Sequence, residues 1–202
     1  MIIILTQCFP PRVGGIENLI ENLSLELSKT HEVLVLADQY DKSEDYVYDS
    51  NVNDNITIKR FGGIKFFRRR KKILNLNKYL KTENITCIIG DSWKSFELCV
   101  DTLQNQSIYS ICLAHGNEII PKHSAYKKRL ITTLNKVSHI VCNSNYTKDL
   151  VLQTGVINKS VTCIHPGAQN NINLSDETIP NLNGSPITVS YTHLTLPTIL
   201  RV

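Results

Sequence analysis

The chain has 202 residues, a formal net charge of +4 and 42% hydrophobic residues, which suffices for one full core and a fragment of a second. Its charges are mixed in sign, which argues against nucleic acid as a partner. No stretch approaches the ~20 apolar residues of a membrane-spanning helix, and no basic residue precedes the apolar N-terminus. We therefore expect neither a spanning helix nor a signal peptide, and a cytoplasmic protein.

The six cysteines fit a reducing compartment. None forms a C-x-x-C pair or a Cys/His cluster with metal-ligand spacing. Five lie within apolar runs, where a free thiol behaves as a small hydrophobic group: Cys87, Cys99, Cys112, Cys142 and Cys163. We expect structural thiols and no metal site.

The N-terminal segment predicts a strand, a glycine turn and a helix in succession. Residues 2–5 form a continuous apolar run, typical of a parallel strand that is buried on both faces. Over residues 16–27 apolar side chains recur at helical spacing. Gly14 and Gly15 lie in the turn between the two elements.

That turn could bind a phosphate. The first N–H groups of a helix have no partner within it, and the helix dipole adds partial positive charge at the same end. Gly14 and Gly15 would let an anion approach the backbone without meeting a Cβ. The pair could equally serve the turn alone, and the dinucleotide fingerprint G-x-G-x-x-G is absent.

The next segments predict two further strands. Residues 32–37 form an apolar strand that ends before Asp38, which could bind a ribose in a dinucleotide-binding domain. Without the glycine fingerprint, a loop residue is the favoured interpretation. Residues 39–55 are polar and indicate an exposed connection, and residues 56–58 alternate as a short strand.

Residues 61–81 combine a helical pattern with a dense cationic block. Ile73, Leu76 and Leu80 fall on one helical stripe. The block and its aromatic neighbours are Phe66, Phe67, Arg68, Arg69, Arg70, Lys71 and Lys72. Basic clusters flanked by aromatic residues bind anionic bilayer surfaces, so we expect an anionic membrane as a partner. The alternative is a solvated helix start whose phenylalanines pack in the core.

A fourth strand over residues 86–90 precedes Asp91, Ser92 and Trp93 at the carboxyl edge, where open α/β sheets bind ligands. Trp93 could line an acceptor cleft or pack between helix and sheet. Helical periodicity resumes over residues 96–103.

Residues 110–118 repeat the pattern of strand and glycine turn. They place His115, Asn117 and Glu118 at the same sheet edge as the first glycine turn. The remaining predicted elements are a basic helix over 125–136, a strand over 139–142, a helix from 145 onward and a strand over 161–164. Ser144 or Asn145 would cap the helix that starts near residue 145 with a side-chain oxygen.

These motifs, in this order, resemble those of the family-four glycosyltransferases of the GT-B fold. The matching stretches are F-P-P-R-V-G-G-I-E, H-E-V-L-V-L, L-A-H-G-N-E, N-S-N-Y-T-K-D-L and H-P-G-A, which together span most of residues 1–168. The resemblance implies an α/β domain with a Rossmann-like open parallel sheet and helices on both faces, the N-terminal half of a GT-B fold.

The resemblance also implies roles for individual residues. In the family the double glycine lies beside the donor's diphosphate, and the histidine of the H-G motif faces the donor sugar, which makes His115 the catalytic candidate. Asn117 and Glu118 would bind sugar hydroxyls, and Ser144 would have a secondary role at the donor.

The reaction implied by the resemblance is the retaining, metal-independent transfer of a hexose to a lipid-linked or saccharide acceptor in polysaccharide biosynthesis. A nucleotide-diphosphate sugar is the co-substrate, and no further cofactor is implied. Many relatives use lipid-linked acceptors at the cytoplasmic leaflet, which points to peripheral binding at the inner membrane face.

The motifs divide the chain into three parts. Residues 1–168 form the acceptor-side domain, residues 169–184 an Asn-rich linker, and residues 185–202 the start of a second domain. The Gly-Arg-Leu, Lys-Gly and E-x7-E motifs of the family's second domain are absent. The ending V-S-Y-T-H-L-T-L-P-T-I-L-R-V resembles translated sequencing-adapter read-through, so we expect a non-native junction near Val189 and a fragment that is inactive alone.

Two alternatives stay open. One is a nucleotide-sugar epimerase of the GT-B fold, which would need no lipid surface. The other is a Rossmann-like module that binds a partner or a membrane without chemistry.

Overall fold

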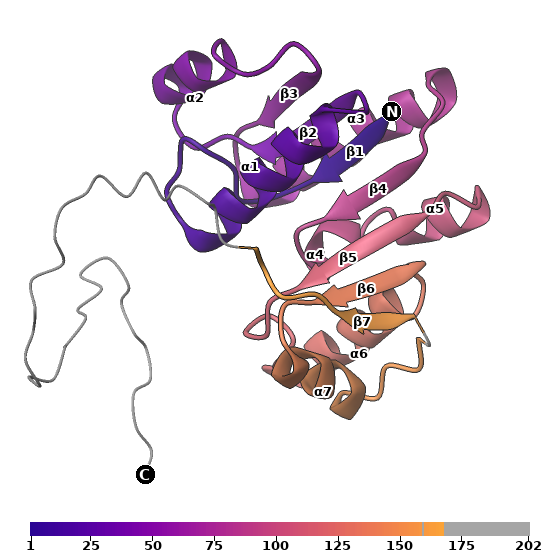
Figure 1. The fold of residues 1–202 in the computed structure, drawn as a ribbon. Helices are drawn as coiled ribbons and strands as arrows, with labels where there is room; N and C mark the ends of the chain where they lie inside the picture. The colour runs from indigo at the N-terminus through magenta and orange to yellow at the C-terminus, as the bar shows by residue number, and fades with distance from the viewer. Residues whose placement is uncertain (159, 168–202) are drawn as a thin grey trace, which may run out of the picture. The chain divides into compact units, whose positions relative to one another are not determined.

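In a computed structural model of the chain, which describes residues 1–158 and 160–167, seven parallel strands form one sheet (Figure 1). The strands are β1 (Ile2–Leu5), β2 (Val33–Asp38), β3 (Ile56–Phe61), β4 (Cys87–Gly90), β5 (Ser110–Ala114), β6 (His139–Cys142) and β7 (Val161–Cys163). Their order across the sheet is β3-β2-β1-β4-β5-β6-β7. The direction of succession reverses between β1 and β4, and open α/β sheets bind ligands outside the carboxyl ends of strands at such a switch point.

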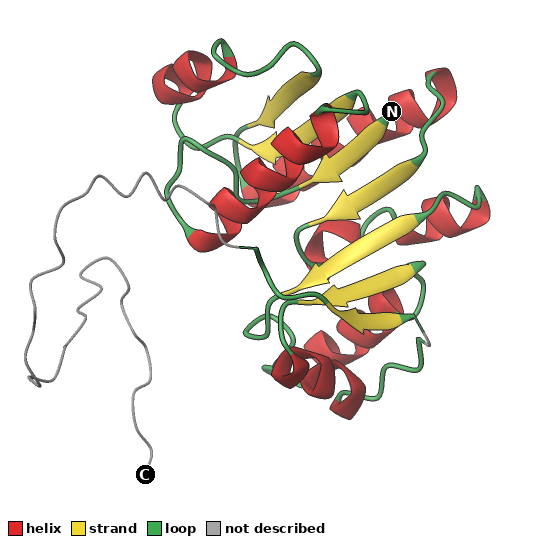
Figure 2. Ribbon diagram, viewed as in Figure 1, coloured by secondary structure: helices red, strands yellow, loops and turns green. Residues whose placement is uncertain are grey.

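Helices cover both faces of this sheet (Figure 2). Helices α1 (Gly15–Ser28) and α2 (Lys42–Asp49) lie on one face. The other face carries α3 (Lys65–Thr82), α4 (Trp93–Phe96), α5 (Val100–Asn105), α6 (Ser124–Leu134) and α7 (Asn145–Gln153). Right-handed crossovers produce this division, because the strands are added in one direction up to β3 and in the other direction afterwards. The predicted Rossmann-like sheet with helices on both faces is confirmed.

Strand β1 has a neighbouring strand on each side, and both of its faces are buried. It pairs with β2 and β4, with Ile2 opposite Val33 on one side and Cys87 on the other. Ile2 and Ile4 enter the core beneath α1, and Ile3 and Leu5 enter the core on the opposite face. The continuous apolar run is therefore needed, since each fully buried side chain contributes about 1.5–3 kcal/mol.

The predicted connection over residues 39–55 is largely exposed, but it contains helix α2, which the polar sequence did not predict. Asp41 caps this helix, accepting hydrogen bonds from Ser43 N at 2.8 Å and Glu44 N at 3.1 Å. Buried Asp45 then pairs with Arg60 of β3 at 3.0 Å. An ion pair holds α2 to the sheet in place of an apolar stripe, so hydrophobic periodicity did not indicate the helix.

The helix predicted over residues 96–103 is two short helices, α4 and α5. Phe96 lies directly against Gly90 at the end of β4, where an added Cβ would come within 2.4 Å of its ring. Trp93 is buried and its indole N–H donates to Glu118 O at 3.0 Å. Of the two interpretations of Trp93, packing between helix and sheet is correct.

The predicted linker, the second-domain start and the junction near Val189 lie outside the described residues. All six cysteines are free, and three of them, Cys99, Cys112 and Cys142, are buried. Within residues 1–158 and 160–167 no helix is long and apolar enough to cross a bilayer, and no three acidic, histidine or cysteine side chains gather as metal ligands would.

Candidate functional site

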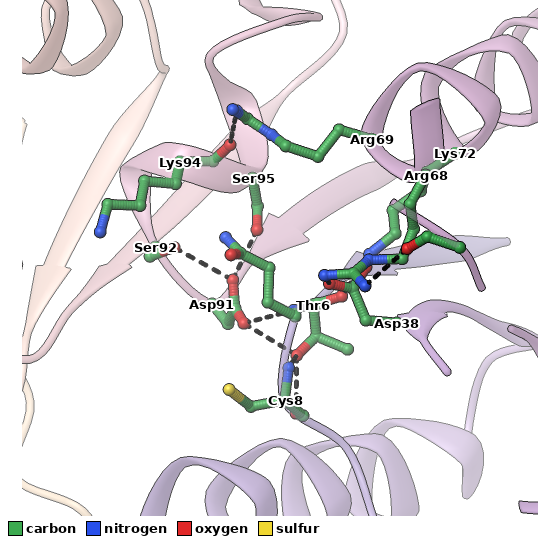
Figure 3. A network of polar contacts seen from close by, with 12 residues as sticks. Thr6, Cys8, Asp38, Arg68, Arg69, Lys72, Asp91, Ser92, Lys94 and Ser95 are labelled. Atoms are coloured by element: carbon green, nitrogen blue, oxygen red, sulfur yellow. Dashed lines mark hydrogen bonds and ion pairs between the residues drawn. The ribbon is translucent and has the colours of Figure 1, made fainter. Parts of the chain in front are cut away.

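The carboxyl ends of β1 and β4 meet at Asp91, which directly follows β4 at the switch point (Figure 3). Its carboxylate accepts hydrogen bonds from the Thr6 hydroxyl at 2.9 Å and from Gln7 N at 2.7 Å. On its other oxygen it accepts from the hydroxyls of Ser95 at 2.6 Å and Ser92 at 3.2 Å. Four neutral donors thus hold this buried carboxylate, which fastens the turn after β1 to the start of α4.

His115 follows β5 at the same edge. Its Nε2 lies 3.0 Å from Asp91 O, and because a carbonyl oxygen only accepts, Nε2 carries the proton and donates. The half-buried ring is therefore fixed in one orientation, which leaves Nδ1 for another partner.

The other two candidates of this turn differ in their surroundings. Glu118 Oε1 accepts from His115 N at 2.7 Å, so this carboxylate closes the turn on itself. The Glu118 main-chain oxygen accepts from Trp93 and from the Tyr126 hydroxyl. Asn117 is exposed and its side chain makes no bond to the described residues. Asn117 is thus open to a ligand, whereas Glu118 already has a structural role.

The two glycines of the turn before α1 also differ in their surroundings. A Cβ at Gly14 would lie 2.2 Å from the carboxylate of Glu17, which is 4% exposed and pairs with Arg12 at 3.0 Å. Gly14 is therefore required by a close contact with the chain's own carboxylate. A Cβ at Gly15 would meet nothing within 4 Å, so the first turn of α1 is open to an approaching group at this residue.

Ser144 caps α7, as the sequence predicts. Its hydroxyl oxygen accepts from Thr147 N at 3.1 Å. Thr147 in turn approaches Gly116, which has a φ of +106° in the left-handed region that favours glycine. Asn143 joins this group, donating to His115 O at 3.4 Å. The residues at the start of α7 thereby contact the turn that carries His115 and hold it in place.

His115 also borders a cavity of about 290 Å³ on the α1 side of the sheet. Its walls are mainly apolar and include Leu19 and Leu23 of α1 and Ile111 and Leu113 of β5. A polar ring at the rim of an apolar hollow is the usual arrangement of a small-molecule site.

Three cations and two carboxylates lie in a second group of ion pairs beside the first. Lys72 is 6% exposed and its ammonium contacts Asp38 Oδ1 at 2.6 Å and Thr6 O at 2.5 Å. Arg68 reaches Asp38 Oδ2 at 2.9 Å, and Arg69 reaches Glu97 at 2.8 Å. Asp38 is the last residue of β2 and not a loop residue, and its carboxylate is engaged by two cations, which leaves the ribose-binding alternative without support.

The predicted membrane-facing block is therefore divided, and the inclusion of Lys72 in it is a mistake. The side chains of Arg68, Arg69 and Lys72 turn toward the protein because their partners, the carboxylates of Asp38 and Glu97, lie on that side of α3. The exposed part of the block consists of Phe66, Phe67, Arg70 and Lys71. Phe66 and Phe67 are 55% and 58% exposed, so the alternative of core phenylalanines is also wrong.

Two ionisable groups at this edge are shifted. Burial raises the pKa of the Cys8 thiol to about 11, and the carboxylates of Asp91 and Glu17 add to the effect. Cys8 is therefore protonated at neutral pH and no nucleophile. Burial lowers the pKa of Lys72, against the opposing attraction of Asp38.

Sequence reasoning identified the strand ends but missed the polar network that joins them. Asp91 was recognisable by its place after a strand at the switch point. Asp38 and Lys72 were both noticed, but the 34 residues that separate them hide their pairing.

The profile of the family described as Glycosyltransferase Family 4 matches residues 13–169. No curated protein matches the chain. Solved structures resemble it at low sequence identity. HepE of Anabaena in complex with UDP gives a TM-score of 0.61 at 14% identity, over 83% of this chain and 44% of HepE. HepE with UDP-glucose gives 0.60 at 14% identity, over 83% of this chain and 44% of HepE.

Two further structures resemble the chain. The lipopolysaccharide outer core galactosyltransferase WaaB, in its apo form, gives 0.58 at 15% identity, over 82% of this chain and 45% of WaaB. The UDP-GlcNAc 2-epimerase from Methanocaldococcus jannaschii gives 0.57 at 12% identity, over 81% of this chain and 45% of the epimerase. The chain thus spans less than half the length of each of these structures.

Proposed function

Because the chain belongs to glycosyltransferase family 4, we propose that it supplies the acceptor-side domain of an enzyme that transfers a sugar from a nucleotide-diphosphate sugar to a lipid-linked or saccharide acceptor. The observation that carries the proposal is the fixed His115 ring on the rim of the cavity beside α1. Structures of HepE with UDP and UDP-glucose support a nucleotide sugar as the donor.

In this proposal each residue of the sheet edge has a separate task. His115 donates a hydrogen bond from Nε2 to Asp91 O. Its Nδ1 accepts a hydrogen bond from a hydroxyl of the donor sugar. The first turn of α1, open at Gly15, faces the diphosphate with the positive end of the helix dipole. Asn117 binds a sugar hydroxyl from the exposed turn. Gly14, Glu118 and Ser144 hold these groups in place.

The finer reaction details also belong to the proposal. We expect a hexose to be transferred with retention and without a metal ion, in the cytoplasm. Neutralising the leaving diphosphate requires cations, a contribution that is usually large. We expect these cations to come from a second domain, so the isolated chain should transfer no sugar. Transfer by residues 1–202 alone would contradict this expectation.

Replacing His115 with Ala tests the proposal in the full-length protein. Loss of a fixed group at the donor sugar should lower kcat roughly 10²-fold. The measurement is the rate at which sugar is transferred from the nucleotide sugar to the acceptor. The control is His31→Ala, an exposed histidine before β2 at the opposite edge of the sheet, which should keep wild-type turnover. Equal turnover of the His115 variant and wild type would remove the catalytic role.

A nucleotide-sugar epimerase is the second candidate, supported by the resemblance to the archaeal epimerase. The two activities differ in the need for an acceptor. An epimerase converts the nucleotide sugar into its epimer when it is the sole substrate, and a transferase requires an acceptor for product. Chromatography of the nucleotide sugar after incubation without acceptor separates them. A module without chemistry would yield neither product.

The exposed surface of α3 supports peripheral binding at an anionic membrane. Phe66 and Phe67 present two adjoining rings, with centroids 5.4 Å apart, and the Arg70 guanidinium stacks over Phe66 at 4.1 Å. Lys71 is exposed beside them. Aromatic rings of this kind insert at the interface, and each cation near the surface contributes about 1 kcal/mol.

Flotation with vesicles of phosphatidylglycerol and phosphatidylcholine tests this surface. The Arg70→Gln/Lys71→Gln variant should lose most binding, since neither side chain forms an ion pair within the described chain. The matched control is Lys127→Gln/Lys128→Gln, an exposed basic pair on α6. Equal losses in both variants would indicate general charge attraction and contradict a specific role for α3.

A further inference from the structure

A second pocket opens at the carboxyl ends of β1 and β2, beside the start of α3. It encloses about 310 Å³, and its walls are mainly polar. It shares no lining residue with the cavity that His115 borders. The sheet edge therefore offers two separate places for ligands, as a reaction between two substrates requires.

Three cationic side chains, Arg12, Lys65 and Arg68, line this pocket together with a single carboxylate, Asp38. Buried Lys72 contacts Asp38 from inside the protein, so a full positive charge already balances this carboxylate. Glu17 balances Arg12. The charges of Arg68 and Lys65 remain, so cations outnumber carboxylates among the side chains that line the pocket.

The two cations also have hydrogen-bond donors to spare. Arg68 donates to Gly63 O at 3.2 Å and pairs with Asp38, but its buried Nε has no acceptor. Lys65 is exposed and its ammonium contacts none of the described residues. The Lys65 ammonium therefore has its donors available for a bound oxyanion, and Arg68 adds its positive charge beside them.

The chemistry of these donors selects the ligand. A guanidinium fork and an ammonium together match the oxygens and the negative charge of a phosphate. Gln7 and Gln39 contribute amides and Tyr40 a phenol to the same wall, groups that bind sugar hydroxyls.

We propose that this pocket binds a phosphate group of the acceptor, so that the acceptor is either a sugar phosphate or a lipid phosphate. The acceptor role rests on the proposed function, whereas the binding of phosphate does not. Both sources present the same chemistry to Lys65 and Arg68. The exposed rings of Phe66 and Phe67 immediately follow Lys65, so a lipid phosphate could enter from a membrane surface.

Calorimetric titration of the 202-residue chain with glucose 6-phosphate, and with glucose as the uncharged control, tests the soluble source. Vesicles of phosphatidylcholine with and without a polyprenyl phosphate test the lipid source. The phosphate-bearing probe should bind in at least one arm, and its uncharged counterpart should bind at least tenfold more weakly.

Variants then locate the binding. Lys65→Gln removes an exposed side chain without an ion pair, so the fold should be retained, and affinity should fall about tenfold for the lost charge-assisted hydrogen bond. Lys65→Glu should reduce it further. The control is Lys127→Gln, an exposed lysine on α6 that does not line the pocket.

Two results would overturn the proposal: no binding of either phosphate-bearing probe, or binding that Lys65→Glu leaves unchanged. Binding of glucose 6-phosphate alone assigns the phosphate to a soluble acceptor, and binding of the vesicles alone assigns it to a lipid. The outcome is independent of the transfer assay. Turnover with a neutral acceptor would keep the proposed function without this pocket, and phosphate binding without turnover would keep the pocket alone.

Discussion

Buried charges at single residues decide how the strand ends of this sheet are joined. Asp38 ends β2, Lys72 comes from α3, and Thr6 contributes a main-chain oxygen from the turn after β1. Removing one charge from such a pair leaves the other without compensation in a poorly solvated place, which costs far more than the pair itself contributes. The network therefore fixes geometry more than it adds stability.

We predict that Asp38→Asn lowers the free energy of unfolding by about 3–5 kcal/mol, because the charge of Lys72 remains buried. The double variant Asp38→Leu/Lys72→Met should recover most of the loss. Urea denaturation followed by circular dichroism measures both. The control is Lys29→Met, which breaks the exposed pair with Glu26 and should cost less than about 1 kcal/mol. A similar cost for both single variants would contradict the prediction.

At the scale of elements, two helix starts carry the functional surfaces. Helix α1 begins at the glycine turn, where the contact between Gly14 and Glu17 is structural and the space beside Gly15 is open. Helix α3 turns Lys72 inward to Asp38 and leaves Lys71 outside. In each case neighbouring residues with the same chemistry divide between support and binding.

The two glycines should respond differently to alanine. Gly14→Ala forces the buried Glu17 carboxylate away from its position, which should cost about 1–3 kcal/mol in denaturation experiments. Gly15→Ala meets open space and should leave stability within about 1 kcal/mol. In the full-length protein Gly15→Ala should nevertheless weaken binding of the nucleotide sugar, measured by titration with UDP. Unchanged UDP affinity would show that the ligand does not approach there.

The sequence was sufficient for elements that bury apolar surface. The run of residues 2–5 and the stripe of α1 predicted their elements because burial requires that spacing. Helix α2 escaped prediction since Arg60 anchors it through Asp45, a pairing between distant residues. The sequence alone could not predict which cations of the block turn inward, because that depends on where Asp38 and Glu97 lie in the fold. The roles assigned to His115, Gly15 and Asn117 stay predictions.

At the scale of the whole molecule, buried thiols make stability depend on pH. Burial raises the pKa of Cys99 to about 12 and of Cys8, Cys87 and Cys142 to about 11, from a usual value of 9.0. Between these values the folded protein holds more protons than the unfolded chain. The lowered pKa of Lys72 acts in the opposite direction below its usual value of 10.5, but one lysine opposes five thiols, because burial also raises the pKa of Cys112.

We therefore predict that the free energy of unfolding falls as pH rises from 9 toward 11. Each thiol contributes up to about 1.4 kcal/mol per pH unit. Urea denaturation under reducing conditions at several pH values measures the slope, and Cys99→Ala should make it shallower by about one proton. A stability that stays constant or rises over this range would contradict the prediction.

Asp91 lies between the two proposed ligand sites and contacts a residue of each. Its side chain holds Gln7, which lines the phosphate pocket, while its main-chain oxygen orients His115 on the rim of the other cavity. Changes that reshape one site through this residue must disturb the other. Under the proposed function, binding of the acceptor and of the donor is coupled through Asp91, so substitutions at Gln7 and His115 should have non-additive effects on turnover.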